Sequence, residues 1–296
     1  MTAPRREADS FAGNAPASSA SVPAASAWRA AIARRVHWLP KPFAWLLRLA
    51  RIVETAVPVG MLSSDDIKHL VFEAYRNAPD FYDPDSYAIR YEDELLPLLQ
   101  EHVAANGGRL LDLYCGHGRE AEIFARAGFA VTGVDAQPAV IDRARTYAES
   151  IGIDVEFLVA DIDNWTPRAQ AWDVIYTSLW MYSTVPDRAA RLAWLKRFRD
   201  WLAPQGVLVI SVTPQPAGSA AGIRHGIATA LSWLTFNKRR PERGDRFTKQ
   251  LFWHDFADRD VRAEATSAGY SVVAALDIEG GTPCNFLLLK AADELP

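Results

Sequence analysis

Short apolar runs alternate with amphipathic stretches between residues 109 and 212, and this alternation constrains the fold more than any other feature of the chain. Each apolar run has the length of a buried strand, and the stretches between them place their apolar residues at helical spacing. Strands that alternate with helices in this way form a parallel sheet covered by helices on both faces. The predicted strands are 109–114, 129–134, 155–159, 172–177 and 207–212, and the predicted helices are 118–126, 139–151 and 188–202.

The link between the first strand and the first helix carries a glycine motif, Asp-Leu-Tyr-Cys-Gly-His-Gly, at residues 112–118. Gly116 and Gly118 permit a tight turn that lets a ligand approach the backbone, and the following helix directs its positive end at that turn. Asp135 closes the second strand, where its carboxylate can accept hydrogen bonds from both hydroxyls of a ribose. The pattern indicates a nucleoside ligand, although the same glycine spacing also suits a dinucleotide-binding dehydrogenase.

Two more acidic residues help to separate these ligands. Asp112 lies in an otherwise apolar strand just before the turn, where a carboxylate would repel a pyrophosphate and attract a cation. Asp161 follows the third strand, where it could read an adenine amino group, and the neighbouring Ile162 could cover the ring. These residues favour a cationic nucleoside over a dinucleotide.

Together with the Ala203-Pro204-Gln205-Gly206 turn before the fifth strand, these motifs resemble the class I S-adenosylmethionine-dependent methyltransferases, particularly their broad small-molecule branch. The resemblance spans about residues 83–290 and is strongest over 109–212. It implies an α/β fold with a Rossmann-like seven-stranded sheet, mostly parallel with an antiparallel last strand, helices on both faces and an N-terminal helical extension. Residues 256–269 would form the penultimate helix, and residues 270–278 and 284–290 the last two strands.

The resemblance implies that S-adenosylmethionine is the cofactor. Gly116 and Gly118 would back its methionine part, Asp112 would lie near its ammonium group, Asp135 would bind the ribose and Asp161 the adenine. The full set of predicted cofactor-binding residues is Asp112, Tyr114, Gly116, Gly118, Asp135, Ala136, Asp161, Ile162 and Ser178. The chain departs from the family at Tyr114, which stands where the turn usually has its first glycine. We expect a tyrosine at a strand end to be sterically ordinary, with at most a slight shift of the loop.

The sequence holds fewer signals for the site of the methyl acceptor than for that of the cofactor. Residues 214–250 form a lid-like insertion in which an apolar helical stretch precedes the basic run 237–243. Such a lid would suit an acidic or amphipathic acceptor, while the alternative is a packed helix followed by a solvated basic loop. Tyr182 and His254 are the candidates for a general base, although Tyr182 could be a packing residue and His254 could cap the next helix.

Ahead of the core the chain divides into three predicted segments. Residues 1–27 are rich in Ala, Ser and Pro and are predicted to be a disordered tail. Residues 28–61 are predicted to form an aromatic, helical arm, which is basic because residues 1–60 hold eight Lys and Arg against three Asp and Glu. Residues 62–108 are predicted as helices that lead into the methyltransferase core at 109–296. Arg48 and Arg51 interrupt the arm's apolar runs, which excludes a membrane span. Packing on the body or on a second subunit and a peripheral membrane contact through 28–61 remain open.

The composition of the chain excludes some classes of binding partner. A net charge of -4 argues against nucleic acid, whose phosphates require a basic surface. The only two cysteines, Cys115 and Cys284, are far apart and have no neighbouring histidine cluster, so the sequence indicates neither a disulfide framework nor a metal site and favours the cytoplasm.

We therefore expect an enzyme that uses S-adenosylmethionine to methylate an oxygen or nitrogen of a small molecule. A nicotinamide-dependent oxidoreductase and a noncatalytic, membrane-proximal binding protein that keeps the fold are the alternatives. The sequence names neither the acceptor nor the oligomeric state.

Overall fold

The computed structural model describes residues 41–77, 91–103, 107–216, 220–248, 251–278 and 284–292. The predicted tail at 1–27 and the arm residues 28–40 lie outside the described residues. The chain divides into two compact units, Met1–Ala50 and Arg51–Pro296, and helix α2 (Lys41–Met61) contributes to both. In the first unit, α2 exposes Trp45, Leu46 and Leu47. No helix within the described ranges is long and apolar enough to cross a bilayer.

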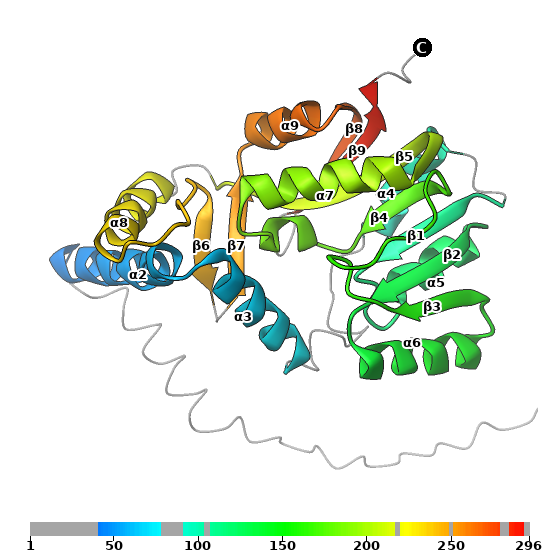
Figure 1. Ribbon diagram of the computed structural model, residues 1–296, viewed down its shortest axis with the longest axis horizontal. Helices are drawn as coiled ribbons and strands as arrows, with labels where there is room; N and C mark the ends of the chain where they lie inside the picture. The colour runs from blue at the N-terminus through cyan, green and yellow to red at the C-terminus, as the bar shows by residue number, and fades with distance from the viewer. Residues whose placement is uncertain are drawn as a thin grey trace, which may run out of the picture. The chain divides into compact units, whose positions relative to one another are not determined.

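The second unit is built on one sheet, which Figure 1 shows. Five strands run parallel in the order β3-β2-β1-β4-β5, and β5 then pairs with the antiparallel β9, which in turn pairs with β8. These seven strands match the predicted sheet, including its antiparallel strand. Their bounds are β1 (Arg109–Leu113), β2 (Ala130–Asp135), β3 (Val155–Val159), β4 (Trp172–Thr177), β5 (Leu202–Pro214), β8 (Tyr270–Ile278) and β9 (Cys284–Ala291).

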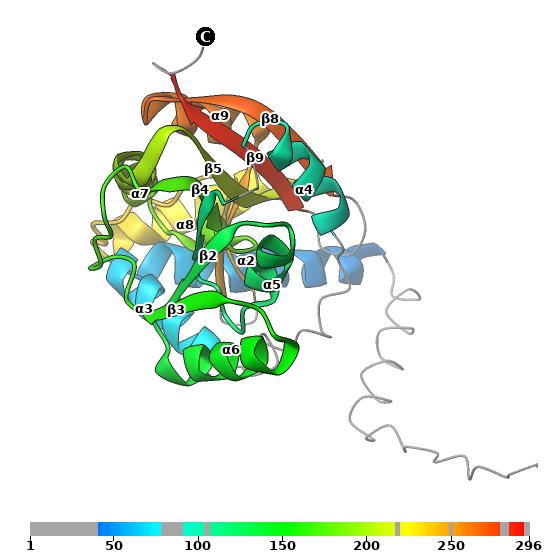
Figure 2. The same ribbon diagram turned by 90° about the vertical axis from the view of Figure 1, so that its right-hand side faces the viewer.

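Helices cover both faces of the sheet, as predicted. One face packs against the apolar sides of α4, α5 and α6, and the other against α7 and α9 (Figure 2). Each cluster alternates along the strands, so Leu110 faces one layer while Leu111 faces the other. The helices are α4 (Glu92–Gln100), α5 (Arg119–Arg126), α6 (Pro138–Ile151), α7 (Arg188–Trp201) and α9 (Asp258–Ser267).

The sheet has nine strands rather than the predicted seven. The two additional strands are β6 (Asp245–Thr248) and β7 (Leu251–Phe256), which form an antiparallel hairpin. The pairing of β9 with β5 ends at Val212, and the last two residues of β5, Thr213 and Pro214, pair with β7 instead. The sequence did not predict this hairpin, because its charged residues are typical of a solvated loop. The hairpin joins the sheet because the end of β5 that β9 leaves unpaired forms backbone hydrogen bonds with β7.

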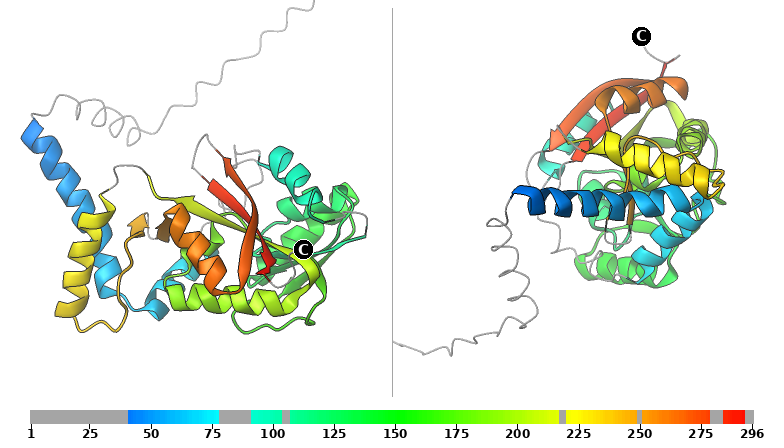
Figure 3. Two further views of the ribbon diagram at one scale, coloured as in Figure 1. Left: turned by 90° about the horizontal axis from the view of Figure 1, so that it is seen from above. Right: turned by 90° about the vertical axis from the view of Figure 1, so that its left-hand side faces the viewer.

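A third apolar cluster lies beside this hairpin. It joins the second-unit part of α2 to α3 (Ser64–Arg76), α8 (Ala221–Leu234), β6 and β7, and we call this assembly the cap. Figure 3 shows α8 and the cap hairpin from above. Helices α2 and α8 cross closely, since a Cβ at Gly60 of α2 would lie 2.5 Å from the carbonyl oxygen of Ala228 in α8. Ser63 and Asp66 form a capping box at the start of α3.

Candidate functional site

The predicted glycine turn lies at the carboxyl end of β1, between the ends of β2 and β4. Gly118 adopts a φ of 81°, and a Cβ there would lie 2.8 Å from the ring of Phe157, so both its conformation and its packing require glycine. The Gly116 amide donates to a carboxylate oxygen of Asp135 at 3.3 Å, and the Ser178 amide donates to the Leu113 carbonyl at 3.0 Å. The fold therefore brings the ends of three strands to one edge.

Asp112 is fully buried under this turn, on the face of β1 that packs against α4, α5 and α6. Neither of its carboxylate oxygens has a hydrogen-bond partner among the described residues. Burial raises its pKa well above the usual value, and the nearby carboxylates of Glu120 and Asp135 raise it further. Three acidic groups thus converge where the sequence predicted a cationic ligand, and one of them has no donor.

Asp135 closes β2 and is largely buried. Its second carboxylate oxygen accepts from the Gln137 amide at 3.0 Å, across the half-buried Ala136. Burial raises the pKa of Asp135, although hydrogen bonds from Gln137 and Gly116 oppose the shift. The Ala136 amide also donates to this carboxylate, and of its about four acceptor sites at least one stays open to a hydroxyl group.

The two predicted adenine contacts follow β3. Asp161 is exposed and closes its own turn, since its carboxylate accepts from the Asp163 amide at 3.0 Å and from the Asn164 side chain at 2.6 Å. Ile162 is buried in the apolar cluster under α7. The Ala160 amide donates to the Asp135 carbonyl at 3.0 Å, which ties this turn to the end of β2.

The backbone conformation of Tyr114 differs from the one that the sequence predicted. Its φ is 62°, the left-handed conformation that costs a non-glycine residue about 1–2 kcal/mol, so the tyrosine is not sterically ordinary. The backbone keeps the shape that a glycine would give the turn. The Tyr114 ring stacks on Trp194 with centroids 5.5 Å apart, which offsets part of the strain.

Sequence reasoning missed Glu120, the second residue of α5. Its carboxylate accepts the hydroxyl of Tyr91 at 2.5 Å, and that hydroxyl lies 3.2 Å from the hydroxyl of Tyr176. Arg119 lies 3.5 Å from the same carboxylate. The signal in the sequence was an acidic residue on the largely buried side of a short helix, but its tyrosine partners come from distant segments.

His254, one of the two base candidates, lies in β7 and does not cap α9, which begins at Asp258. Its Nδ1 lies 2.7 Å from a carboxylate oxygen of Asp245, and no described residue bonds its Nε2. Asp245 also accepts from the buried guanidinium of Arg239 and from the Glu242 amide. Burial alone would raise the pKa of Asp245, but the hydrogen bond from His254 and the charge of Arg239 outweigh it and hold the pKa below its usual value.

Tyr182, the other base candidate, is fully buried in a short 3₁₀ helix, η4 (Met181–Thr184). Its hydroxyl donates to Glu264 at 2.8 Å, and its ring stacks on Phe256. Burial raises the pKa of Tyr182 well above 10, with the charge of Glu264 as the next cause. The structure thus gives Tyr182 a packing role, and its role as a base stays a prediction.

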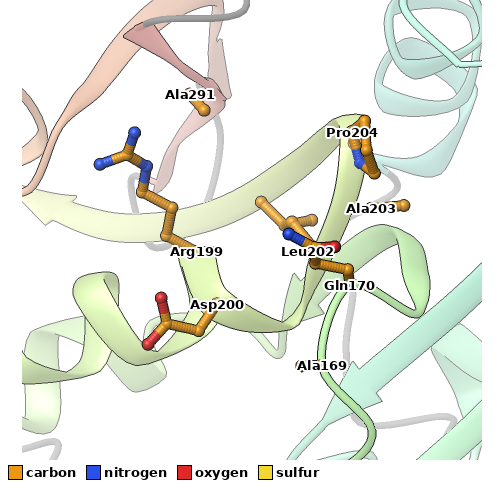
Figure 4. Close-up of a pocket in the computed structure, with 9 residues that line it drawn as sticks. Ala169, Gln170, Arg199, Asp200, Leu202, Ala203, Pro204 and Ala291 are labelled. Carbon is orange, nitrogen blue, oxygen red and sulfur yellow. The ribbon is translucent and has the colours of Figure 1, made fainter.

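Two surface cavities adjoin β5. Figure 4 shows one of about 410 Å³ at the amino-terminal end of the strand, where Arg199 and Asp200 lie near Ala203 and Pro204. This cavity is at the opposite end of the parallel strands from the glycine turn and lies outside the candidate site. The second, of about 350 Å³, lies beside Pro214 at the carboxyl end of β5 and reaches Phe256 and Asp258.

Comparison with known proteins agrees with this geometry. Residues 110–206, from β1 into β5, match the family described as "Methyltransferase domain". Over these residues the chain carries a methyltransferase domain, in agreement with the resemblance of its motifs to the class I S-adenosylmethionine-dependent methyltransferases. A protein named ubiquinone biosynthesis O-methyltransferase from Actinobacillus pleuropneumoniae is 29% identical over 157 residues, which cover 51% of this chain and 65% of that protein. The protein of the same name from Paramagnetospirillum magneticum is 32% identical over 49% of this chain and 61% of its own length.

Solved structures show the methyltransferase fold. A Burkholderia thailandensis 1,6-didemethyltoxoflavin-N1-methyltransferase, solved with S-adenosylhomocysteine bound, has a TM-score of 0.59 at 16% identity and covers 78% of this chain and 92% of its own. A Pyrococcus horikoshii protein has a TM-score of 0.55 at 22% identity and covers 74% of this chain and 98% of its own. The matches to the first curated relatives span between 50% and 65% of those proteins. The nicotinamide and noncatalytic alternatives gain no support from these comparisons.

The residues at the sheet edge fit the cofactor of this family. Asp112 offers an ionisable group without a donor to an ammonium group, and the glycine turn exposes backbone beside it. Asp135 offers at least one open acceptor site to a ribose hydroxyl at the end of the next strand. A dinucleotide would place its pyrophosphate against three carboxylates, which the methyltransferase cofactor avoids.

Proposed function

We propose that the protein transfers the methyl group of S-adenosylmethionine to an oxygen or nitrogen of a small-molecule acceptor. The observation that carries the proposal is Asp112, a buried carboxylate without a hydrogen-bond partner beside the glycine turn. Asp112 receives the cofactor's ammonium group, Asp135 its ribose and Asp161 its adenine, while Gly116 and Gly118 admit its methionine part. Tyr114, Ala136, Ile162 and Ser178 complete the proposed contacts.

An amphipathic molecule with a hydroxyl group is the acceptor class we favour. The curated relatives are named for O-methylation in ubiquinone biosynthesis, and the apolar cap of this chain stands beside the carboxyl end of β5. In the reaction the acceptor oxygen forms a bond to the methyl carbon as the carbon–sulfur bond breaks. S-adenosylhomocysteine leaves, and the hydroxyl proton passes to a base.

His254 is the better base candidate of the two. Asp245 fixes its Nδ1, so the neutral ring presents Nε2 as the acceptor for a proton. The hydroxyl of Tyr182 is already bonded to Glu264. We propose Asp245 as the residue that orients His254.

Turnover tests the proposal. Purified protein is incubated with S-adenosylmethionine and a panel of catechols, phenols and amines, and S-adenosylhomocysteine is measured by mass spectrometry. We expect product with hydroxyl-bearing aromatic acceptors, and a kcat about 10²–10⁴-fold lower in His254→Ala with unchanged cofactor affinity. Cofactor binding without turnover of any acceptor would favour the noncatalytic alternative, and failure to bind would refute the proposal.

Location is a separate proposal. The arm at 28–61 exposes Trp45, Leu46 and Leu47 in its described part, and we keep peripheral membrane contact through it as a proposal. A reducing cytoplasm is the proposed compartment, supported by two buried and free cysteines.

A further inference from the structure

Helix α8 is apolar on its exposed face as well as its buried one. A helix at a protein surface normally carries charged or polar residues toward solvent. Ile223 is 60% exposed, Trp233 63% and Leu234 75%, and no charged residue lies among the exposed positions of this helix. Those exposed positions are Gly222, Ile223, Gly226, Ala230, Trp233 and Leu234.

The end of α8 adds an aromatic residue that folding does not require. The Asn237 amide donates to the Ser232 carbonyl at 2.9 Å, a bond that closes a helix through a left-handed residue. Phe236 is that residue, with a φ of 55° where glycine is usual, and 92% of its surface is exposed. A bulky ring is thus held in a strained conformation and projected into solvent.

The same end is rimmed by cations. No Asp or Glu occurs between Asp200 and Glu242. The guanidinium of Arg240 lies over the ring of Trp233, 4.1 Å from its centroid, while Lys238 is exposed and forms no ion pair with any described residue. Aromatic and aliphatic side chains surrounded by Lys and Arg are typical of surfaces that insert into the interface of an anionic bilayer.

We propose that this end of α8 docks on an anionic phospholipid surface. We call it the α8 tip and define it as Trp233, Leu234, Phe236, Lys238 and Arg240. A second copy of the chain is a poorer occupant, because a two-fold contact would bring the cations of both tips together. The inference goes beyond the proposed methyl transfer and does not depend on it.

Vesicle binding tests the α8 tip in the full-length protein. Vesicles of phosphatidylcholine, alone or mixed with phosphatidylglycerol, are sedimented with the protein at two salt concentrations. We expect binding to the mixed vesicles that weakens as salt rises. The variant Lys238→Ser/Arg240→Ser should bind them about tenfold or more weakly. The variant Trp233→Ser/Leu234→Ser/Phe236→Gly should lose binding to a similar extent.

Three further variants make the test specific. Val159→Ser on β3 removes an exposed apolar side chain elsewhere, and Arg143→Ser on α6 removes an exposed cation; both should bind vesicles like the original protein. Phe236→Gly alone should raise the melting temperature by relieving the strained φ and still weaken vesicle binding. A purely structural Phe236 would lower the melting temperature and leave binding unchanged.

Two results would overturn the proposal. One is vesicle binding that survives both the cation variant and the apolar variant, which would place the lipid contact elsewhere, for example in the arm. The other is an absence of vesicle binding together with a concentration-dependent dimer that the apolar variant abolishes in light scattering, which would make the α8 tip a self-association surface.

Discussion

Two buried aspartates, Asp112 at the sheet edge and Asp245 in the cap, occupy opposite electrostatic environments. Asp245 accepts from Arg239, His254 and the Glu242 amide, and its pKa lies below the usual value. Asp112 has no donor and lies near other carboxylates, so its pKa lies well above the usual value. Burial alone therefore does not distinguish the two carboxylates, whereas the absence of a donor among the described residues does, and it is the reason that Asp112 is proposed to bind a ligand.

The largest predicted effect concerns the stability of the cap. Asp245→Ala should lower the free energy of unfolding by about 3 kcal/mol, because it removes the buried carboxylate shared by Arg239 and His254 and leaves Arg239 only the more exposed carboxylate of Asp187. Urea denaturation monitored by tryptophan fluorescence measures this. Asp258→Ala, which removes an exposed partner of Arg262, is the matched control and should cost less than about 0.5 kcal/mol. Equal costs for the two variants would contradict the stabilising role of Asp245.

Asp112→Asn should weaken ligand binding without destabilising the fold, the opposite of the effect of Asp245→Ala. We expect the affinity for S-adenosylhomocysteine to fall by about 1.5–3 kcal/mol, because the ligand's ammonium group loses a charged acceptor. The free energy of unfolding without ligand should stay equal or rise, since the variant removes the cost of burying an ionisable group. Calorimetric titration and urea denaturation of the same preparation measure both quantities. A large loss of stability with unchanged affinity would reverse the assignment.

Asp135→Ala should affect both quantities, the affinity for the cofactor and the free energy of unfolding. Its carboxylate is proposed to bind ribose and also accepts from the Gly116 and Gln137 amides. The variant should weaken cofactor binding by about 1–3 kcal/mol and also lower stability modestly. An unchanged affinity in the calorimetric titration would remove Asp135 from the proposed site.

The smallest predicted effect is a dependence of the free energy of unfolding on pH. A carboxyl whose pKa is raised in the folded state stabilises the fold below its unfolded pKa, and this contribution is lost as pH rises through the folded pKa. Asp112 should therefore make the ligand-free protein less stable as pH rises above about 4. Asp112→Asn should lack this slope, so its stability advantage should grow with pH. A difference that stays constant with pH would show that Asp112 does not titrate in this way.

The sequence predicted the edge of the sheet well because the motif there is local. The order of Asp112, Gly116 and Gly118 determines a strand, a turn and a helix start within one short segment, and Asp135 closes the neighbouring strand. The cap was predicted poorly, because the β6–β7 hairpin forms where β5 extends past β9, a feature of the assembled sheet. The expectation of cationic groups in the lid failed for Arg239, which is buried against Asp245.

Two features at the edge of the sheet differed from the prediction or were missed, for different reasons. Tyr114 holds a left-handed conformation although its type predicts an ordinary strand end, because the turn needs that conformation and stacking on Trp194 offsets the strain. Glu120 was missed because its bonds to Tyr91 and to Arg119 depend on how α4 packs against α5.

The central claim is that Asp112 receives the cation of the cofactor, and proton release on binding tests it most directly. Pairing with an ammonium group favours the ionised carboxylate, so a carboxyl that is protonated in the free protein should release a proton. Titration of S-adenosylhomocysteine by calorimetry in two buffers of different ionisation enthalpy counts the protons. We predict release from the original protein and none from Asp112→Asn, whose binding is weaker. Equal proton counts and equal affinities would contradict the claim.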